Sequence, residues 1–152
     1  MRAVSFACVE TLSVSPAEIA ERMLDLSRWS DFQGYGILPG IASARFLTRA
    51  PEVVGSRIEV TNRDGSTHIE EIIEWRLDER LRLRMTEFSP PLRRLATSFV
   101  ETWEFRHVNA GTVVTRSFDL HAASIAAWPV LWIIARLLKK AVSRHLAAMR
   151  AA

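Results

Sequence analysis

The chain has 152 residues, 49% of them apolar, and its 6 glycines and 6 prolines are typical of one globular domain. The 20 basic and 17 acidic residues leave a net charge of +3, which does not indicate a nucleic-acid partner, and we expect none. A single cysteine, Cys8, excludes an internal disulfide. The N-terminal segment lacks a signal-peptide pattern, and the longest uncharged apolar stretch, 122–135, is shorter than the roughly 20 residues that span a bilayer. We therefore expect a cytoplasmic protein with a single domain over residues 1–152 and no cofactor.

The first 40 residues predict a strand followed by two short helices. Residues 4–14 are rich in β-branched and small apolar side chains, which favours a strand. The sequence Ser-Pro-Ala-Glu at 15–18 combines a capping serine, a proline at the first helical position and the glutamate of a capping box. We predict an amphipathic helix over 15–26, a second short helix or turn over 27–32, and a glycine-containing loop over 33–40.

The middle of the chain predicts an antiparallel sheet, because the apolar period changes from 3.6 to 2 and short turn sequences separate the runs. We expect strands near 42–49, 56–62, 67–77, 80–88, 97–108 and 112–121. From about Ser124 the helical period returns and continues to the end of the chain. This order predicts an α+β fold in which one long helix covers the apolar face of the sheet.

The same order resembles the START and birch-allergen-like helix-grip superfamily, in its polyketide cyclase/dehydrase and lipid-transport branch. The resemblance is carried by the capped entry at 15–18 with Asp25-Leu26-Ser27-Arg28-Trp29, by Pro51-Glu52-Val53-Val54-Gly55-Ser56-Arg57, and by the hairpin from Glu101-Thr102-Trp103-Glu104-Phe105 to Gly111-Thr112-Val113-Val114-Thr115. It implies a curved seven-stranded antiparallel sheet wrapped around the C-terminal helix and enclosing a cavity. It further implies binding or transport of a hydrophobic molecule, and in some members cyclisation or dehydration.

Strand alternation predicts which side chains face that cavity. The apolar wall is predicted to contain Trp75, Met85, Phe99, Trp103 and Phe118 from the sheet and Leu138 from the helix. Three ionisable residues, Glu71, Glu101 and Arg116, occupy positions on the same face where alternation favours apolar side chains. An unpaired charge in a core costs several kcal/mol, so these groups must be paired or solvated.

The last hairpin brings two of these charges together. Pairing across the turn at 109–111 places Arg116 opposite Trp103 or Phe105. If Trp103 is the partner, Glu101 lies within diagonal reach, which leads to the hypothesis of an Arg116–Glu101 ion pair beside the Trp103 ring. Such a pair is a plain buried pair, an anchor for the polar group of a ligand, or part of a catalytic site. Glu71 either faces the cavity or lies solvated at the rim of the sheet.

The C-terminal helix has an apolar stripe with His145 in its middle. His145 is either a core residue, or a general acid or base if a pocket reaches it. At the start of the helix, the side chains of Trp128, Trp132 and Ile133 point in different directions around the helix axis, so the sheet cannot cover them all. We expect this end to contact a second subunit, a membrane surface or the loop over 33–40.

Three functions follow from these features. The leading hypothesis is a binding or transport domain in which Arg116 and Glu101 hold the polar end of a hydrophobic small molecule or lipid. The alternatives are a polyketide-type cyclase or dehydratase with His145 as acid or base, and a partner-binding protein whose cavity has collapsed. We expect no metal site, because His68 and Glu70 are two residues apart on the predicted outer face and lack a third ligand.

Overall fold

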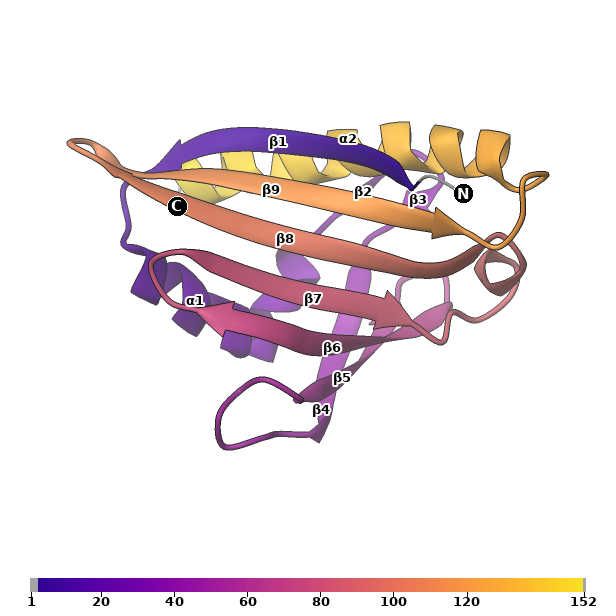
Figure 1. Cartoon of the computed structure of the whole chain (residues 1–152), viewed down its shortest axis with the longest axis horizontal. Coiled ribbons are helices and arrows are strands. Elements are labelled where there is room, and N and C mark those ends of the chain that lie inside the picture. The colour runs from indigo at the N-terminus through magenta and orange to yellow at the C-terminus, as the bar shows by residue number, and fades with distance from the viewer. Residues whose placement is uncertain (1–2, 152) are drawn as a thin grey trace.

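A seven-stranded antiparallel sheet curves past a long C-terminal helix in the computed structural model, which describes residues 3–151 (Figure 1). The strand order is β1-β9-β8-β7-β6-β5-β4. The strands of this sheet are β1 (Val4–Leu12), β4 (Ile41–Thr48), β5 (Arg57–Asn62), β6 (Thr67–Arg76), β7 (Arg80–Thr86), β8 (Ala96–Val108) and β9 (Gly111–Ala122). The helices are α1 (Pro16–Leu24), α2 (Trp128–Ala151) and the 3-10 helices η1 (Leu26–Asp31) and η2 (Leu92–Arg94). The predicted helix-grip α+β fold is confirmed.

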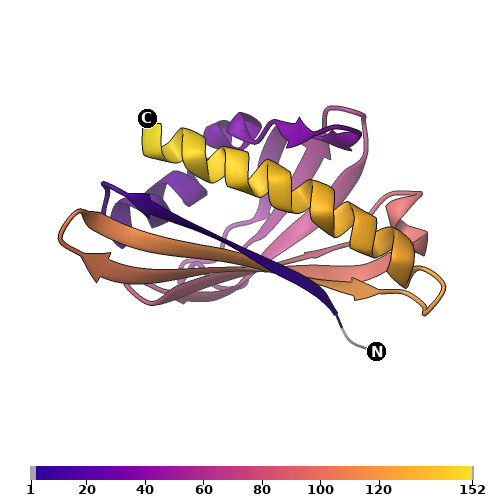
Figure 2. The ribbon, with the colours of Figure 1, turned by 90° about the horizontal axis from the view of Figure 1, so that it is seen from above.

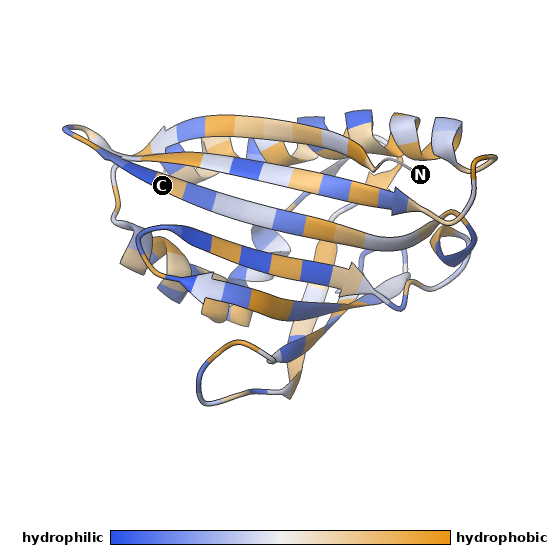
Figure 3. Ribbon diagram, viewed as in Figure 1, coloured by the Kyte–Doolittle hydropathy of each residue, from blue (hydrophilic) through white to orange (hydrophobic). Residues whose placement is uncertain are grey.

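The helices lie on one side of the sheet. Seen from above, α2 runs across that side together with α1 and a small hairpin made of β2 (Gly34–Tyr35) and β3 (Leu38–Pro39) (Figure 2). Along β7 the polar and apolar residues alternate strictly, as the hydropathy colouring shows, so the apolar set faces the helices (Figure 3). The sheet therefore presents an apolar face to the helices at β7.

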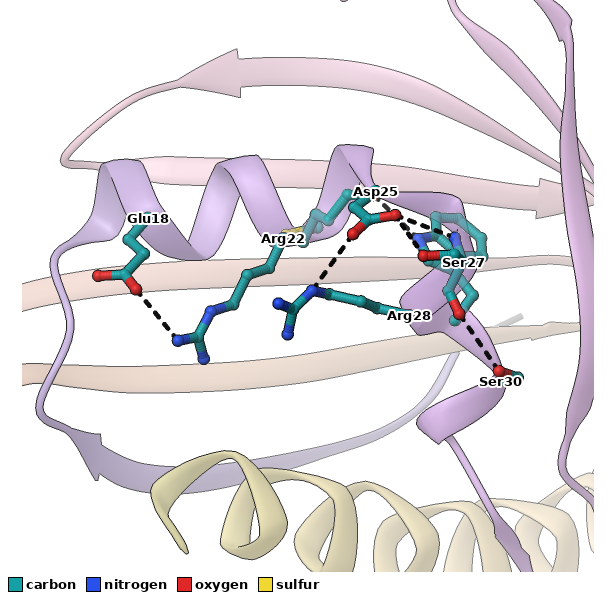
Figure 4. Close-up of polar contacts among 8 residues, drawn as sticks. Glu18, Arg22, Asp25, Ser27, Arg28 and Ser30 are labelled. Atoms are coloured by element: carbon teal, nitrogen blue, oxygen red, sulfur yellow. Dashed lines mark hydrogen bonds and ion pairs between the residues drawn. The ribbon is translucent and has the colours of Figure 1, made fainter. Parts of the chain in front are cut away.

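The entry to the two short helices is fixed by local hydrogen bonds. The Ser15 side chain accepts from the Glu18 backbone N–H at 3.2 Å, which caps α1 as predicted. Arg22 pairs with Glu18 one turn earlier at 3.1 Å, and Asp25 accepts from the backbone and hydroxyl of Ser27 and from Arg28, as Figure 4 shows. The Asp25 side chain thereby caps η1. These bonds set the direction of the segment that carries Trp29 and Phe32 against the core.

The prediction for the inner face of β6 is wrong over the first half of the strand. Cross-strand pairing joins Glu70 to Ile58 on one side and to Met85 on the other, so Glu70 shares the inner face with these apolar residues. Glu71 instead pairs with Arg57 and Arg84 on the opposite face. A β-bulge between Ile72 and Glu74 shifts the register, so the alternation changes phase within the strand.

The last helix begins later than predicted. Ser124 accepts a hydrogen bond from the Ala127 backbone N–H at 3.2 Å in a turn, and α2 starts at Trp128 with Pro129 in its first turn. Its inner face buries Leu131, Leu138 and Leu146 against the sheet. Within the described residues, no helix is long and apolar enough to cross a membrane.

Candidate functional site

A cavity of about 360 Å³ lies between the sheet, α2 and the two short helices. Most of its wall is apolar, with large side chains from nearly every element: Met23, Trp29, Phe32, Leu38, Met85, Phe88, Phe99, Trp103, Phe118, Ile134 and Leu138. The size falls within the range of small-molecule sites. The interior is open, so the alternative of a collapsed cavity is wrong.

Eight of the ten predicted site residues line this cavity: Met85, Phe99, Glu101, Trp103, Arg116, Phe118, Leu138 and His145. Two are not in its wall. Glu71 lies on the outer face of β6, as the pairing shows. Trp75 follows the bulge, pairs with Leu81 and packs half-buried against the core beyond the cavity.

Arg116 and Glu101 form the predicted buried ion pair. Arg116 Nε donates to Glu101 Oε2, and less than a tenth of either side chain is exposed. The pairing register places Arg116 opposite Trp103 and Glu101 opposite Phe118, which is the predicted diagonal arrangement. The guanidinium carbon lies 4.5 Å from the centre of the Trp103 ring. The aromatic face therefore offsets part of the desolvation of the arginine.

His145 joins this pair from α2. Its Nδ1 lies 2.9 Å from Arg116 Nη1, and because a guanidinium only donates, Nδ1 must accept. Burial, reinforced by the positive charge of Arg116, lowers the pKa of His145 to about 3. The imidazole is therefore neutral at neutral pH and carries its proton on Nε2. We call Glu101, Arg116 and His145 the Arg116 cluster.

This arrangement changes what His145 can do. The Nδ1 lone pair is occupied by Arg116, so the ring offers a hydrogen-bond donor, Nε2–H, rather than a base. Burial raises the pKa of Glu101, with Arg116 opposing that effect and the charge of Glu70 adding to it. Arg116 keeps further N–H groups that neither partner uses. The cluster therefore presents mainly donors to the cavity.

A second polar pair in the cavity wall was missed by the sequence analysis. His68 Nε2 lies 2.9 Å from Glu70 Oε2, and the side chains are 11% and 4% exposed. Both residues line the cavity, and not the outer face as predicted. The sequence contains two consecutive acidic residues, Glu70 and Glu71, and one of them must lie on the inner face of the strand. Strict alternation assigns Glu71 to that face, and this assignment is wrong because a bulge follows. Across residues 3–151 no group of three metal-ligating side chains gathers.

The sheet does not cover all the apolar residues at the start of α2, as predicted. The large apolar residues that are exposed there are Ile125, Trp128, Val130, Trp132 and Ile133, which we call the outer α2 surface. The loop over 33–40 does not cover it. Its hairpin lies against the second half of the helix, where the Tyr35 ring is 5.1 Å from Lys140 Nζ. Trp132 is instead contacted by Arg136, whose guanidinium carbon lies 4.9 Å from a ring centre.

A curved antiparallel sheet that encloses an apolar cavity against a C-terminal helix defines a hydrophobic-ligand-binding domain of the START and birch-allergen type. The chain belongs to the polyketide cyclase / dehydrase and lipid transport family, whose model matches residues 4–152. No curated protein matches the sequence.

Solved structures share the fold at low sequence identity. A START superfamily protein from Mycobacterium smegmatis aligns with a TM-score of 0.73 at 10% identity, over 97% of both chains. The di-domain ARO/CYC protein StfQ from the steffimycin biosynthetic pathway aligns with a TM-score of 0.72 at 16% identity, over 99% of this chain and 50% of StfQ. The protein XoxI from Bacillus cereus aligns with a TM-score of 0.67 at 14% identity, over 97% of this chain and 94% of that one.

Proposed function

We propose that the protein binds or transports a hydrophobic small molecule or lipid in the cavity, with the polar end of the ligand held by the Arg116 cluster. The observation that carries this proposal is the placement of hydrogen-bond donors on buried Arg116 and half-buried His145 in a wall that is mostly apolar. A pocket of this kind gains affinity from apolar burial and orientation from its few polar groups. A hydrogen-bond acceptor such as a carbonyl oxygen fits these donors.

A cavity-filling variant tests the proposal directly. Met85 points into the cavity, whereas Arg84, its neighbour on β7, is exposed on the other face. We expect Met85→Trp to abolish saturable binding of the neutral fluorescent probe Nile red, and Arg84→Trp to leave it unchanged. Native mass spectrometry of the freshly purified wild type should also detect a co-purifying hydrophobic compound at near one per chain. Equal binding by both variants would contradict the proposal.

An enzymatic role is the second candidate, as a cyclase or dehydratase. It is favoured by the two donors, because Arg116 and neutral His145 could polarise a carbonyl in a cavity of low polarity. In this role His145 acts as a donor and not as the base. Incubation of the co-purified compound with fresh protein distinguishes the two functions: a dehydratase removes water from it, and a carrier returns it unchanged.

We further propose that the outer α2 surface contacts an anionic membrane. The sequence has no acidic residue after Asp119, and the helix carries five cations: Arg136, Lys139, Lys140, Arg144 and Arg150. Exposed tryptophans together with basic residues on one helix are typical of helices that lie at the bilayer surface. The charge therefore favours anionic lipid over a second copy of the same cationic helix.

Vesicle flotation tests the membrane contact. We expect binding to vesicles of phosphatidylcholine with phosphatidylglycerol, weaker binding to phosphatidylcholine alone, and loss of binding in the Trp128→Ser/Trp132→Ser double variant. Leu77→Ser, which alters an exposed apolar residue on the β6–β7 turn, is the matched control. A dimer in light scattering that the double variant converts to monomer, without any vesicle binding, would assign the surface to a homodimer instead. The cytoplasmic location stays a prediction.

A further inference from the structure

The His68–Glu70 pair lies in the same cavity as the Arg116 cluster but apart from it. Glu70 pairs across the sheet with Met85, and Met85 pairs with Phe99. Glu101 follows Phe99 by two residues on the same face of β8. Two strand spacings and a two-residue step separate the Glu70 and Glu101 backbones by about 12 Å along a flat sheet. The side chains between them in this register, Met85 and Phe99, are apolar.

The pair leaves acceptors free in the cavity. Among residues 3–151, the contact at 2.9 Å is the one side-chain hydrogen bond that either His68 or Glu70 makes, and it uses a single carboxylate oxygen. The remaining oxygen, Glu70 Oε1, makes no side-chain hydrogen bond within residues 3–151, and Glu70 lines the cavity. Because a carboxylate oxygen accepts hydrogen bonds, Glu70 Oε1 is open to a donor group of a ligand.

The buried charges in the wall disfavour an anionic ligand at the Arg116 cluster. The other charged residues of the wall, Arg22, Arg28 and Asp64, are not buried, and Arg22 and Arg28 pair with Glu18 and Asp25. Two buried carboxylates, Glu70 and Glu101, face one buried guanidinium, Arg116, and His145 is neutral. A carboxylate ligand at the Arg116 cluster would lie beside Glu101, whose own charge already occupies the arginine. A neutral acceptor, such as a carbonyl oxygen, avoids this repulsion and still uses the free N–H groups.

We propose that the His68–Glu70 pair is a second polar anchor, which accepts a hydrogen bond from a hydroxyl group of the ligand. This inference rests on the proposed function and narrows its ligand class. The ligand is an elongated neutral molecule with an apolar body, a carbonyl-type acceptor at the Arg116 cluster and an alcohol or phenol donor at Glu70. A ligand of this class satisfies both ends of the cavity, whereas a ligand without the hydroxyl leaves a buried carboxylate oxygen unpaired, which weakens binding.

A pair of matched probes tests the second anchor on wild-type protein. The ketones 10-hydroxydecan-2-one and 10-methoxydecan-2-one share the carbonyl and the chain, but only the first has an O–H donor. Because hydrogen bonds to charged groups are strong, we expect the hydroxy ketone to bind about tenfold more tightly in calorimetry or probe displacement. Equal or tighter binding of the methoxy ketone would overturn the inference.

Variants then locate the effect. Replacing both partners of a buried pair by apolar residues is often tolerated, so His68→Leu/Glu70→Leu should fold. In this double variant we expect the hydroxy ketone to lose its tenfold advantage, and in the control Glu71→Leu, on the outer face of the same strand, to keep it. An advantage that survives in the double variant would place the donor site elsewhere and refute the assignment. If the double variant does not fold, the wild-type comparison decides.

The two proposals fail in different ways. If neither ketone binds wild-type protein that still binds Nile red in the cavity, the ligand class is wrong and the proposed function stands. If Met85→Trp and Arg84→Trp bind that probe equally, the cavity is not the binding site and both proposals fall.

Discussion

Replacement of His145 by glutamine should remove a specific part of the acid sensitivity of the fold. In the unfolded chain the imidazole takes up a proton near its ordinary pKa of 6.5, whereas in the folded protein its pKa is about 3. Between these values the unfolded state binds the extra proton, so the free energy of unfolding falls as the pH falls through this window. One proton contributes about 1.4 kcal/mol per pH unit, or about 3 kcal/mol from pH 6 to pH 4.

Urea titrations followed by circular dichroism at pH 6, 5 and 4 measure this contribution. Glutamine keeps an acceptor for Arg116 but does not titrate, so the wild type should lose about 3 kcal/mol more than His145→Gln over this range. Acid titration of the carboxyl groups is common to both proteins and cancels in the difference. His107→Gln, at an exposed histidine, should behave as the wild type does. Parallel stability curves for the wild type and His145→Gln would refute a buried neutral His145.

Further substitutions test the buried ion pair, the packing of α2 and the turn between β8 and β9. Arg116→Met should lower the free energy of unfolding by about 3–5 kcal/mol, because it leaves the Glu101 charge buried alone, and Glu101→Leu/Arg116→Met should recover most of that loss in urea denaturation. Leu131→Ala, at a fully buried position of α2, should cost about 2–5 kcal/mol, whereas Trp132→Ala beside it should cost about 0.5 kcal/mol or less. Gly111→Ala should lower the melting temperature sharply, because this glycine has a φ of 136° and an added Cβ would lie 2.1 Å from a backbone oxygen.

The order of elements could be predicted because each boundary has its own local signal. The Ser15 cap ends the first strand and starts α1, and the short turn at residues 109–111 fixes the register of β8 against β9. The turn left Trp103 or Phe105 as the partner of Arg116, and the first of these registers, which the structure has, predicts the Arg116–Glu101 pair. The hairpin of β2 and β3 was predicted as a loop, because strands of two residues are too short to show alternation.

The position of His145 could be predicted only in part. Helical periodicity placed it on the apolar stripe, but its contact with Arg116 depends on where α2 crosses the sheet, which no local pattern records. The same holds for Phe32, whose ring meets the His145 ring edge-on at 5.7 Å between centroids. Contacts between elements that are distant in sequence depend on how the elements pack. Such a contact, with Arg116, makes His145 Nδ1 a hydrogen-bond acceptor and helps to keep the imidazole neutral.

The one error that matters for function arises at a single residue of β6. Strict alternation assigns every second residue of a strand to the same face. If Trp75 is placed on the inner face, Glu71 must also lie there and Glu70 must lie on the outer face. The bulge between Ile72 and Glu74 lets both ends face inward at the cost of one irregular step. Without it, Glu71 would replace Glu70 in the cavity wall, and His68 would lie outside with Glu70. The bulge therefore gives the cavity a second polar group, the His68–Glu70 pair, besides the Arg116 cluster. An irregular step in a strand beside a cavity changes which residues face inward, and alternation alone does not predict it.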